Sequence, residues 1–343
     1  MGRDDMGIGT NISHWLSQSR LDHEQRKTFF TRDDVRQLAD WGFDHLRLPI
    51  DESVMYDQAD QADPRAWAFM DRAIDWASEA GMKVIVDLHI LRGHHFHEDL
   101  PALFTDDAAV ARFVTIWREL ADHPADRPTD AVAFELLNEP KAPDNASWNR
   151  VWREAYQAIR ATQPDRTIVI GPNHYQIAPN APDLAIGDDG PQIVSFHFYG
   201  PMAVTHYRAS WAPPLDEYDG PVRYPGQPIA DADLADATPA VRRMMSETDA
   251  NQPFDPNAMR ALIEPALKLR ERTGVRLHCG EFGCRTIVPL ETRRRWYGDL
   301  IGLFVEHEIG YANWDYRGGF GLIDADGNPT GVLEIITQSA RPR

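Results

Sequence analysis

The chain has 343 residues, of which 43% are hydrophobic and 26% are charged, a composition typical of a soluble globular protein. Its formal net charge is -18, which would repel the phosphates of a nucleic acid and suits a neutral substrate, although the charge also serves solubility. No run of about 18 uncharged apolar residues occurs, so no membrane span is predicted.

The first ten residues lack the basic-then-apolar pattern of a signal peptide. We therefore expect either an intracellular protein or one whose signal has been removed. Cys279 and Cys284 would lie about 16 Å apart in an extended segment, whereas a disulfide needs Cα atoms within about 7 Å. No disulfide is expected unless the chain turns sharply, and the sequence indicates no oligomeric state.

A repeating pattern of a short apolar run, a polar patch and an amphipathic helix extends along the chain. Several apolar runs are continuous rather than alternating, which is typical of a parallel sheet buried on both faces. Strands alternating with helices fit a closed (β/α)8 barrel or an open doubly wound sheet. No glycine-rich phosphate loop follows the first strand, which counts weakly against a dinucleotide fold. The eight predicted strands are Gly7–Ser13, His45–Ile50, Lys83–His89, Ala131–Asn138, Thr167–Gly171, Ile193–Tyr199, Val275–Glu281 and Gly310–Trp314.

Apolar stripes at helical spacing lie between these strands, and we predict that their tryptophans are core residues. In the first stripe, Asp63 is the expected N-cap and Pro64 the first helical residue. The stripes are Trp67, Met70, Ile74 and Ala77; Val110, Phe113, Val114, Trp117 and Leu120; Trp148, Val151, Trp152, Ala155 and Ile159; and Leu300, Leu303 and Phe304 within Glu291–Glu308.

The segment 201–256 breaks the repeating pattern, because it is rich in Pro, Asp and Tyr and shows little periodicity. It is too long for a simple connection and follows the sixth predicted strand, on the side where barrel active sites are built. We interpret it as an elaborated substrate loop, in which a short helix near Thr238–Glu247 can form. A disordered insert is the alternative.

Six of the eight predicted strands end in polar or aromatic side chains that suit catalysis or sugar binding. One such residue could belong to a structural ion pair, but a ring of them at the carboxyl ends is where barrel enzymes place catalytic groups. These residues are Arg47, Asp87 and His89, Asn138 and Glu139, His197 and Tyr199, Glu281, and Trp314.

Two carboxylates on different strands suit the cleavage of a glycosidic bond, in which one donates a proton and the other attacks the anomeric carbon or activates water. Their pKa values must be held apart by different surroundings. We expect Arg47 and Tyr199 to keep Glu281 ionised. Asn138 and His197 are expected to lie near Glu139 and to hold it protonated.

These motifs resemble glycoside hydrolase family 5, the cellulase family, over nearly the whole chain, from Gly9-Thr-Asn-Ile-Ser-His-Trp-Leu16 to Asn313-Trp-Asp-Tyr316. The resemblance implies a single TIM barrel, no metal or other cofactor, and double displacement with retention. It makes Glu139, in Asn-Glu-Pro, the acid/base and Glu281 the nucleophile, with carboxyl groups about 5–5.5 Å apart. The implied supporting and substrate-binding residues are Arg47, His89, Asn138, His197, Tyr199 and Trp314, to which we add Asn11.

Two segments depart from the family pattern near the predicted sugar-binding end. Many members carry Gly-Gly before the first-strand Trp-Leu, where this chain has Ser13-His14, and His94, His95 and His97 follow the third strand. Sugar hydrogen bonding is expected of His94 and His95, with ordinary loop polarity and a zinc site as alternatives. Trp211 is expected either to stack on a sugar or to pack the long loop down.

The resulting function prediction is a retaining β-glycosidase that acts on a β-linked oligo- or polysaccharide. An endo-β-1,4-glucanase is the first hypothesis. The second is an exo-acting β-glucosidase, or a glycosidase on another β-linked glycan such as mannan or β-1,3-glucan. A carbohydrate-binding pseudoenzyme is a distant third, because both carboxylates are present.

Overall fold

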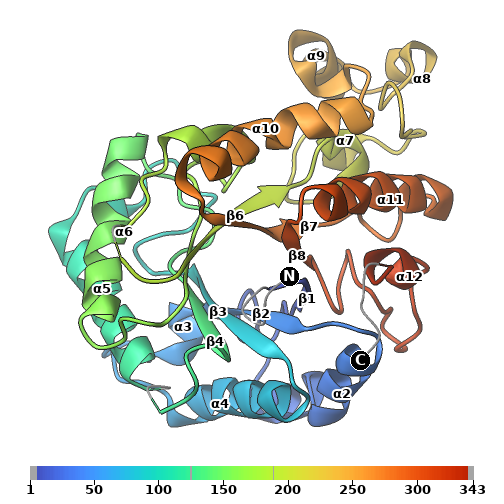
Figure 1. Ribbon diagram of the computed structural model, residues 1–343. Helices are drawn as coiled ribbons and strands as arrows, with labels where there is room; N and C mark the ends of the chain where they lie inside the picture. The colour runs from blue at the N-terminus through green and yellow to red at the C-terminus, as the bar shows by residue number, and fades with distance from the viewer. Residues whose placement is uncertain (1–5, 124–125, 188, 339–343) are drawn as a thin grey trace.

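The computed structural model describes residues 6–123, 126–187 and 189–338. Eight parallel strands in this part of the chain close into a barrel in the order of the sequence, with β8 pairing back onto β1. Figure 1 shows the helices arranged around these strands. The closed barrel confirms the predicted (β/α)8 fold and excludes the doubly wound alternative. The strands are β1 (Ile8–Asn11), β2 (His45–Asp51), β3 (Lys83–Ile90), β4 (Val132–Glu135), β5 (Ile168–Ile170), β6 (Gln192–Phe198), β7 (Arg276–Phe282) and β8 (Gly310–Asn313).

The strand positions agree with the prediction, but several strands are shorter than predicted. The fourth was expected to continue to Asn138, yet β4 ends at Glu135. The ladders of β4 to β3 and to β5 both stop at Glu135, which pairs with Asp87 and with Val169. Residues 136–139 are therefore a loop at the barrel mouth, and Glu139 has a left-handed backbone with φ 46°.

The helices occupy the predicted stripes with small differences at their ends. Asp63 accepts a hydrogen bond from the Arg65 N–H as the N-cap of α4, and Pro64 is the first helical residue, as predicted. The helix predicted over Glu291–Glu308 is α11, which runs from Leu290 to Glu306. The other α-helices are α1 (His23–Phe29), α2 (Arg32–Asp40), α3 (Glu52–Met55), α4 (Pro64–Glu79), α5 (Asp107–Asp122), α6 (Asn145–Arg160), α7 (Met202–Thr205), α8 (Asp231–Ala235), α9 (Pro239–Glu247), α10 (Pro256–Thr273) and α12 (Leu333–Ile336).

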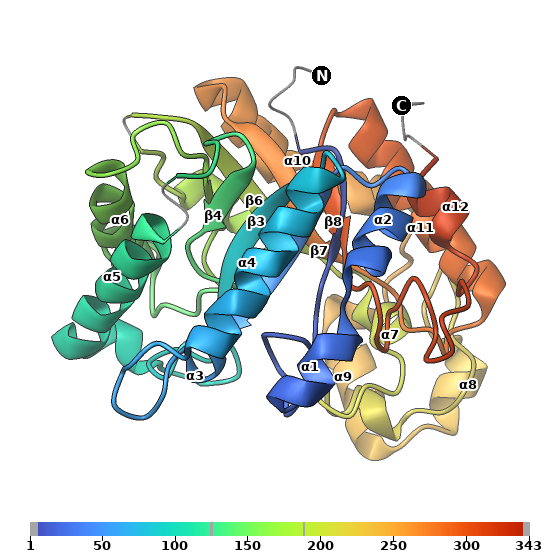
Figure 2. The same ribbon diagram turned by 90° about the horizontal axis from the view of Figure 1, so that it is seen from below.

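The segment 201–256 is a loop with short helices rather than a disordered insert, and α9 falls where a short helix was considered. Thr238 caps α9 by accepting from the Val241 N–H, and Pro239 opens the helix. Figure 2 shows α7, α8 and α9 at the same end of the barrel as α1 and α3, which follow the carboxyl ends of β1 and β2. The insertion therefore lies on the side of the strand ends that carry the predicted site.

Two apolar layers hold the barrel. Alternate strand residues pack inward in a small cluster at the amino end of the barrel, formed by Met6, Ile85, Ala133, Val169 and Ile193. The intervening residues face the helices and join the large outer core, in which the stripe tryptophans are buried. Because both faces are covered, β2 is buried at every position, including its polar residues His45, Arg47 and Asp51. Among the described residues, no helix is long and apolar enough to cross a membrane.

Candidate active site

The carboxyl ends of the strands bring the predicted polar residues together around one buried cation, Arg47 on β2. Its side chain is fully buried, and every N–H group of the guanidinium has an acceptor. The Nε atom lies 2.6 Å from Glu135 Oε2, and Nη1 lies 2.7 Å from Glu281 Oε1. Nη2 lies 3.1 Å from Asp87 Oδ2. One guanidinium thus faces three carboxylates, and the planar fork of arginine suits this task.

Glu281 stands near the end of β7 with both carboxylate oxygens bonded. Arg47 donates to Oε1 at 2.7 Å, and the Tyr199 hydroxyl donates to Oε2 at 3.0 Å. A register shift opposite Gly280 pairs His197 with Glu281 across β6 and β7, so both side chains reach the same place. The expected partners of Glu281 are therefore confirmed, and they orient its oxygens while favouring the ionised form.

His197 lies close to both Glu139 and Glu281. The His197 Nδ1 atom lies 2.9 Å from Glu139 Oε1 and 3.6 Å from Glu281 Oε2. One oxygen of each carboxylate and one His197 nitrogen all lie within 4.8 Å of one another. An approach this close fits the roughly 5–5.5 Å between the carboxyl groups of retaining glycosidases.

The two carboxyl groups have different electrostatic surroundings. Burial raises the pKa of Glu139 well above its usual range, and the neighbouring charge of Glu281 raises it further. Burial also raises the pKa of Glu281, but Arg47 and then His89 act against that increase. Desolvation lowers the pKa of His197 well below its usual value, so this imidazole is neutral. The site thus favours a protonated Glu139 beside an ionised Glu281.

The same three residues are the one group of potential metal ligands within the described parts of the chain. Several of their ligand atoms are already engaged, because both oxygens of Glu281 accept from Arg47 and Tyr199 and His197 Nδ1 bonds to Glu139 Oε1. The adjacent Arg47 guanidinium supplies positive charge at this point. We therefore describe the group as a hydrogen-bonded cluster. His94, His95 and His97, for which a zinc site was the alternative, do not form such a group, even with the adjacent Glu98.

His89 and Trp314 form the floor of the site next to Glu281. Their rings are stacked, with centroids 5.5 Å apart and an interplanar angle of 10°. His89 Nδ1 lies 2.7 Å from Asp87 Oδ2, and Gln18 Nε2 lies 3.2 Å from His89 Nε2. Burial lowers the pKa of His89 to about 4, so the ring is neutral. Because Gln18 donates to Nε2, the hydrogen-bond network assigns the His89 proton to Nδ1.

Asn11 and Asn138, which were predicted as supporting or substrate-binding residues, both contact Arg47. The side-chain oxygen of each accepts from Arg47 at 2.8 Å, and both residues are buried. The Asn11 amide also donates to the carbonyl of Gly280 at 2.9 Å. Asn138 was expected to help hold Glu139, but its side-chain oxygen accepts a hydrogen bond from the Arg47 guanidinium. Asn11 thus helps hold Arg47 and ties β1 to β7.

Two residues of the site, Glu135 and Gln176, were missed by the sequence analysis. Glu135 alternates with Ala133 on the inward face of β4, a periodic signal that could have indicated it. Gln176 follows β5 in a left-handed backbone with φ 53°. Its amide donates to Glu135 Oε1 at 3.0 Å, and its carbonyl oxygen Oε1 accepts from the Glu139 N–H at 2.7 Å. No local pattern predicts this connection.

His94, in the loop after β3, was expected to hydrogen-bond a sugar, but the structure places it elsewhere. This residue is fully buried, and its Nε2 atom accepts from the Lys141 N–H at 3.3 Å, because the β3 loop folds back against the loop after β4. It is therefore not on the sugar-facing surface. His95 is partly exposed, and its ring stacks on that of the exposed His97 with centroids 5.2 Å apart.

Trp211, in the long insertion, remains 47% exposed and is therefore available for stacking. The Arg285 guanidinium lies 5.3 Å from its ring centroid, and the Phe320 ring lies 6.3 Å away. Phe320 is in turn 6.0 Å from Tyr199. A series of aromatic contacts thus leads from the insertion to a donor of Glu281, which places Trp211 on the same side of the molecule as the carboxylates.

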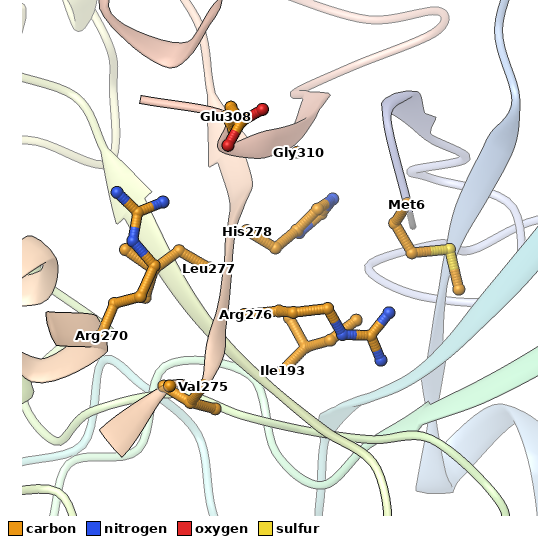
Figure 3. A pocket seen from close by; sticks show the side chains of 10 residues that line it. Met6, Ile193, Arg270, Val275, Arg276, Leu277, His278, Glu308 and Gly310 are labelled. Carbon is orange, nitrogen blue, oxygen red and sulfur yellow. The ribbon is translucent and has the colours of Figure 1, made fainter. Parts of the chain in front are cut away.

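A cavity of about 310 Å³ lies at the opposite, amino end of the barrel, seen in Figure 3. The side chains that line it come from the start of β7 and its surroundings, and they include Arg276, His278 and Met6. Glu308 is the single carboxylate in the lining. Because glycosidic cleavage needs two carboxylates, this cavity is not a candidate for that chemistry.

Comparison with known proteins agrees with the geometry. The family model "Cellulase (glycosyl hydrolase family 5)" matches residues 10–319. Endoglucanase C of Acetivibrio thermocellus is 33% identical over 338 residues, which cover 97% of each chain. Cellodextrinase A of Ruminococcus flavefaciens is 28% identical over 88% of this chain and 82% of its own.

Solved structures share the fold. A hyperthermophilic endo-beta-1,4-glucanase in complex with substrate has a TM-score of 0.79 at 22% identity and covers 98% of this chain and 100% of its own. Endoglucanase Cel5A of Thermotoga maritima has a TM-score of 0.77 at 23% identity, covering 97% and 98%. The family match and the relatives, which align with most of this chain, agree with the barrel fold and show that the chain belongs to glycosyl hydrolase family 5 and is a glycoside hydrolase.

Proposed function

We propose that this enzyme hydrolyses internal β-1,4-glucosidic bonds with retention of anomeric configuration, with Glu139 as acid/base and Glu281 as nucleophile. The observation that carries the proposal is the electrostatic contrast between two neighbouring buried carboxyl groups. Glu281 accepts from Arg47 and Tyr199, whereas the Glu139 carboxylate is held by the neutral His197. Endoglucanase C, a relative that covers the whole domain, supports the choice of β-1,4-glucan.

In the first step, Glu281 attacks the anomeric carbon while Glu139 gives its proton to the departing glycosidic oxygen. Arg47 and Tyr199 orient the attacking carboxylate and keep it ionised. Formation of the glycosyl ester removes the charge of Glu281. The repulsion that raised the pKa of Glu139 then disappears, so Glu139 can act as a base in the second step.

In the second step, Glu139 takes a proton from water, and the resulting hydroxide attacks the anomeric carbon and releases Glu281 as a carboxylate. The neutral His197 remains 2.9 Å from the Glu139 oxygen, where it can bond to either protonation state. No step requires a metal, so we expect full activity in EDTA. Restoration of lost activity by a divalent cation would contradict this mechanism.

Small-anion rescue distinguishes the roles of the two glutamates. In Glu281→Gly, azide can occupy the space of the nucleophile, and we expect an activated aryl β-glucoside to give the α-glycosyl azide. In Glu139→Gly, azide attacks the ester on Glu281, and we expect the β-glycosyl azide. Without azide, each variant should lose several orders of magnitude in kcat. Azide products of the opposite configuration would reverse the assignment.

An exo-acting glucosidase is the second candidate, and the insertion of segment 201–256 favours it. Its helices α7, α8 and α9 add structure at the carboxyl ends of the strands, where they can close one end of a cleft. The viscosity of a soluble β-glucan, measured against the release of reducing ends, separates the two modes. Endo action predicts a steep fall in viscosity at low conversion, whereas exo action predicts little fall.

A further inference from the structure

His14 lies at the edge of the site, beside Trp314. It follows β1 and has a left-handed backbone with φ 59°, which is costly for a residue with a side chain. Glycine would adopt this conformation without strain. A side chain kept in such a conformation beside an active site points to a function.

The side chain of His14 lies against the floor of the site. Its ring meets Trp314 edge to face, with centroids 6.4 Å apart and an interplanar angle of 76°. Its Nδ1 atom lies 3.4 Å from the Gln18 carbonyl oxygen, and the Gln18 side chain bonds to His89. His14 therefore extends the His89–Trp314 stack toward solvent, and 42% of its side chain is exposed.

Asp315 lies on another side of the His14 ring. This carboxylate is fully buried and accepts from the Ser13 hydroxyl at 2.6 Å. His14 Nε2 lies 3.8 Å from Asp315 Oδ2, which is too far for a direct hydrogen bond. Ser13 thus donates a hydrogen bond to Asp315, and the neighbouring His14 faces the same carboxylate. The pair acts as a unit in which one residue anchors the carboxylate that faces the other.

We propose that His14 is a substrate-binding residue whose Nε2 atom accepts a hydrogen bond from a hydroxyl of the sugar that lies on Trp314. The Nδ1–H group donates to the Gln18 carbonyl, which leaves the Nε2 lone pair for a ligand. The ring is oriented before the sugar arrives, because Trp314 and the Gln18 carbonyl contact it on separate sides. The proposal rests on the proposed function.

Three variants separate the hydrogen bond from the packing. His14→Phe keeps a ring beside Trp314 but has no acceptor, His14→Gly removes both and relaxes the backbone, and His14→Gln restores an acceptor. We expect His14→Phe and His14→Gly to raise KM for a cello-oligosaccharide about tenfold with kcat nearly unchanged, the pattern of a lost ground-state contact. His14→Gln should recover part of the loss, and the Tm of His14→Gly should not fall.

His123→Phe is the matched control. His123 also packs edge to face on a tryptophan, Trp67, at 4.6 Å, and its Nε2 lies 2.9 Å from Asp71 Oδ2. It lies at the end of α5, away from the site, so its kinetics should match those of the wild type.

Affinity for cellotetraose in the Glu281→Gln background provides a readout that does not need turnover. An unchanged KM and Kd in His14→Phe would overturn the role of His14 while leaving the proposed function intact. A wild-type enzyme that does not cleave β-1,4-glucan would overturn the proposed function. Weaker cellotetraose binding by His14→Phe would still support the contact in that case.

Discussion

At the mouth of the barrel, one guanidinium is surrounded by more negative than positive charge. Arg47 faces Asp87, Glu135 and Glu281, and Glu139 lies one hydrogen-bonded histidine away. Removing Arg47 would leave these buried carboxylates without their counter-charge, which costs far more than the loss of a surface ion pair. The excess negative charge is useful here, because it keeps a proton on Glu139 while Arg47 keeps Glu281 ionised.

The pH dependence follows from this charge distribution. Glu139 must be protonated to act as an acid, so activity is present below its pKa and is lost as the pH rises through it. Burial is the first cause of its raised pKa, and the charge of Glu281 is the second. Replacing Glu281 by Gln removes the second cause and should therefore lower the pKa of Glu139.

Carboxyl ¹³C NMR of glutamate-labelled wild type and Glu281→Gln measures this change directly. The Glu139 resonance should titrate at a lower pH in the variant, and a Glu139→Gln sample assigns the signal. A midpoint that stays in place or moves up would mean that the two carboxyl groups do not interact as the geometry indicates.

Among the elements, the short connection after β5 supplies a residue that bonds to two glutamates of the site. His174, Tyr175 and Gln176 all have positive φ, and this path returns Gln176 into the barrel mouth. There it bonds to both the Glu139 backbone and the Glu135 side chain. The β5 connection thus positions the backbone of the acid/base through buried Gln176.

Gly171 provides the space for this arrangement. A Cβ atom at that residue would lie 2.2 Å from Gln176 Cγ, so Gly171→Ala must displace the glutamine. We expect kcat/KM on a soluble β-glucan to fall about tenfold, as for the loss of one hydrogen bond to a positioned group. Gly298→Ala in α11 is the control, because a Cβ there meets nothing within 4 Å. It should be fully active and about 0.5–1 kcal/mol more stable. Wild-type kinetics in Gly171→Ala would exclude a role for the Gln176 contacts.

On the scale of the whole molecule, the net charge of -18 acts on any charged substrate. An anionic substrate such as carboxymethyl cellulose is repelled at low ionic strength, whereas a neutral β-glucan is not. Because the Debye length falls from about 30 Å at 0.01 M salt to about 8 Å at 0.15 M, added salt should screen this repulsion.

We therefore expect KM for carboxymethyl cellulose to fall several-fold between these salt concentrations, with little change for neutral barley β-glucan. Initial rates on both polymers, measured with the same enzyme preparation, test the prediction. An equal change in KM for the two polymers would mean that the acidic side chains lie away from the surface that the substrate approaches.

The sequence by itself determined the alternation of strands and helices and the set of residues at the strand ends. Apolar periodicity depends on short stretches of chain, and parallel strands bring their carboxyl ends to one face whatever their order. The amino-acid sequence alone was therefore enough to group Arg47, Glu281, Tyr199, His197 and Glu139. The bounds of β4, by contrast, depended on its neighbours, since its ladders to β3 and β5 both end at Glu135.

Only the tertiary structure decided which side chains bond to one another. Asp315 and Ser13 are 302 positions apart, and Gln176 and Glu139 are 37 apart, so no local pattern links either pair. His94 illustrates the same limit, since a polar loop residue became buried when the β3 loop packed against Lys141. Such contacts depend on how separate loops meet above the barrel, and a left-handed residue such as His14 is recognised only when its backbone is seen.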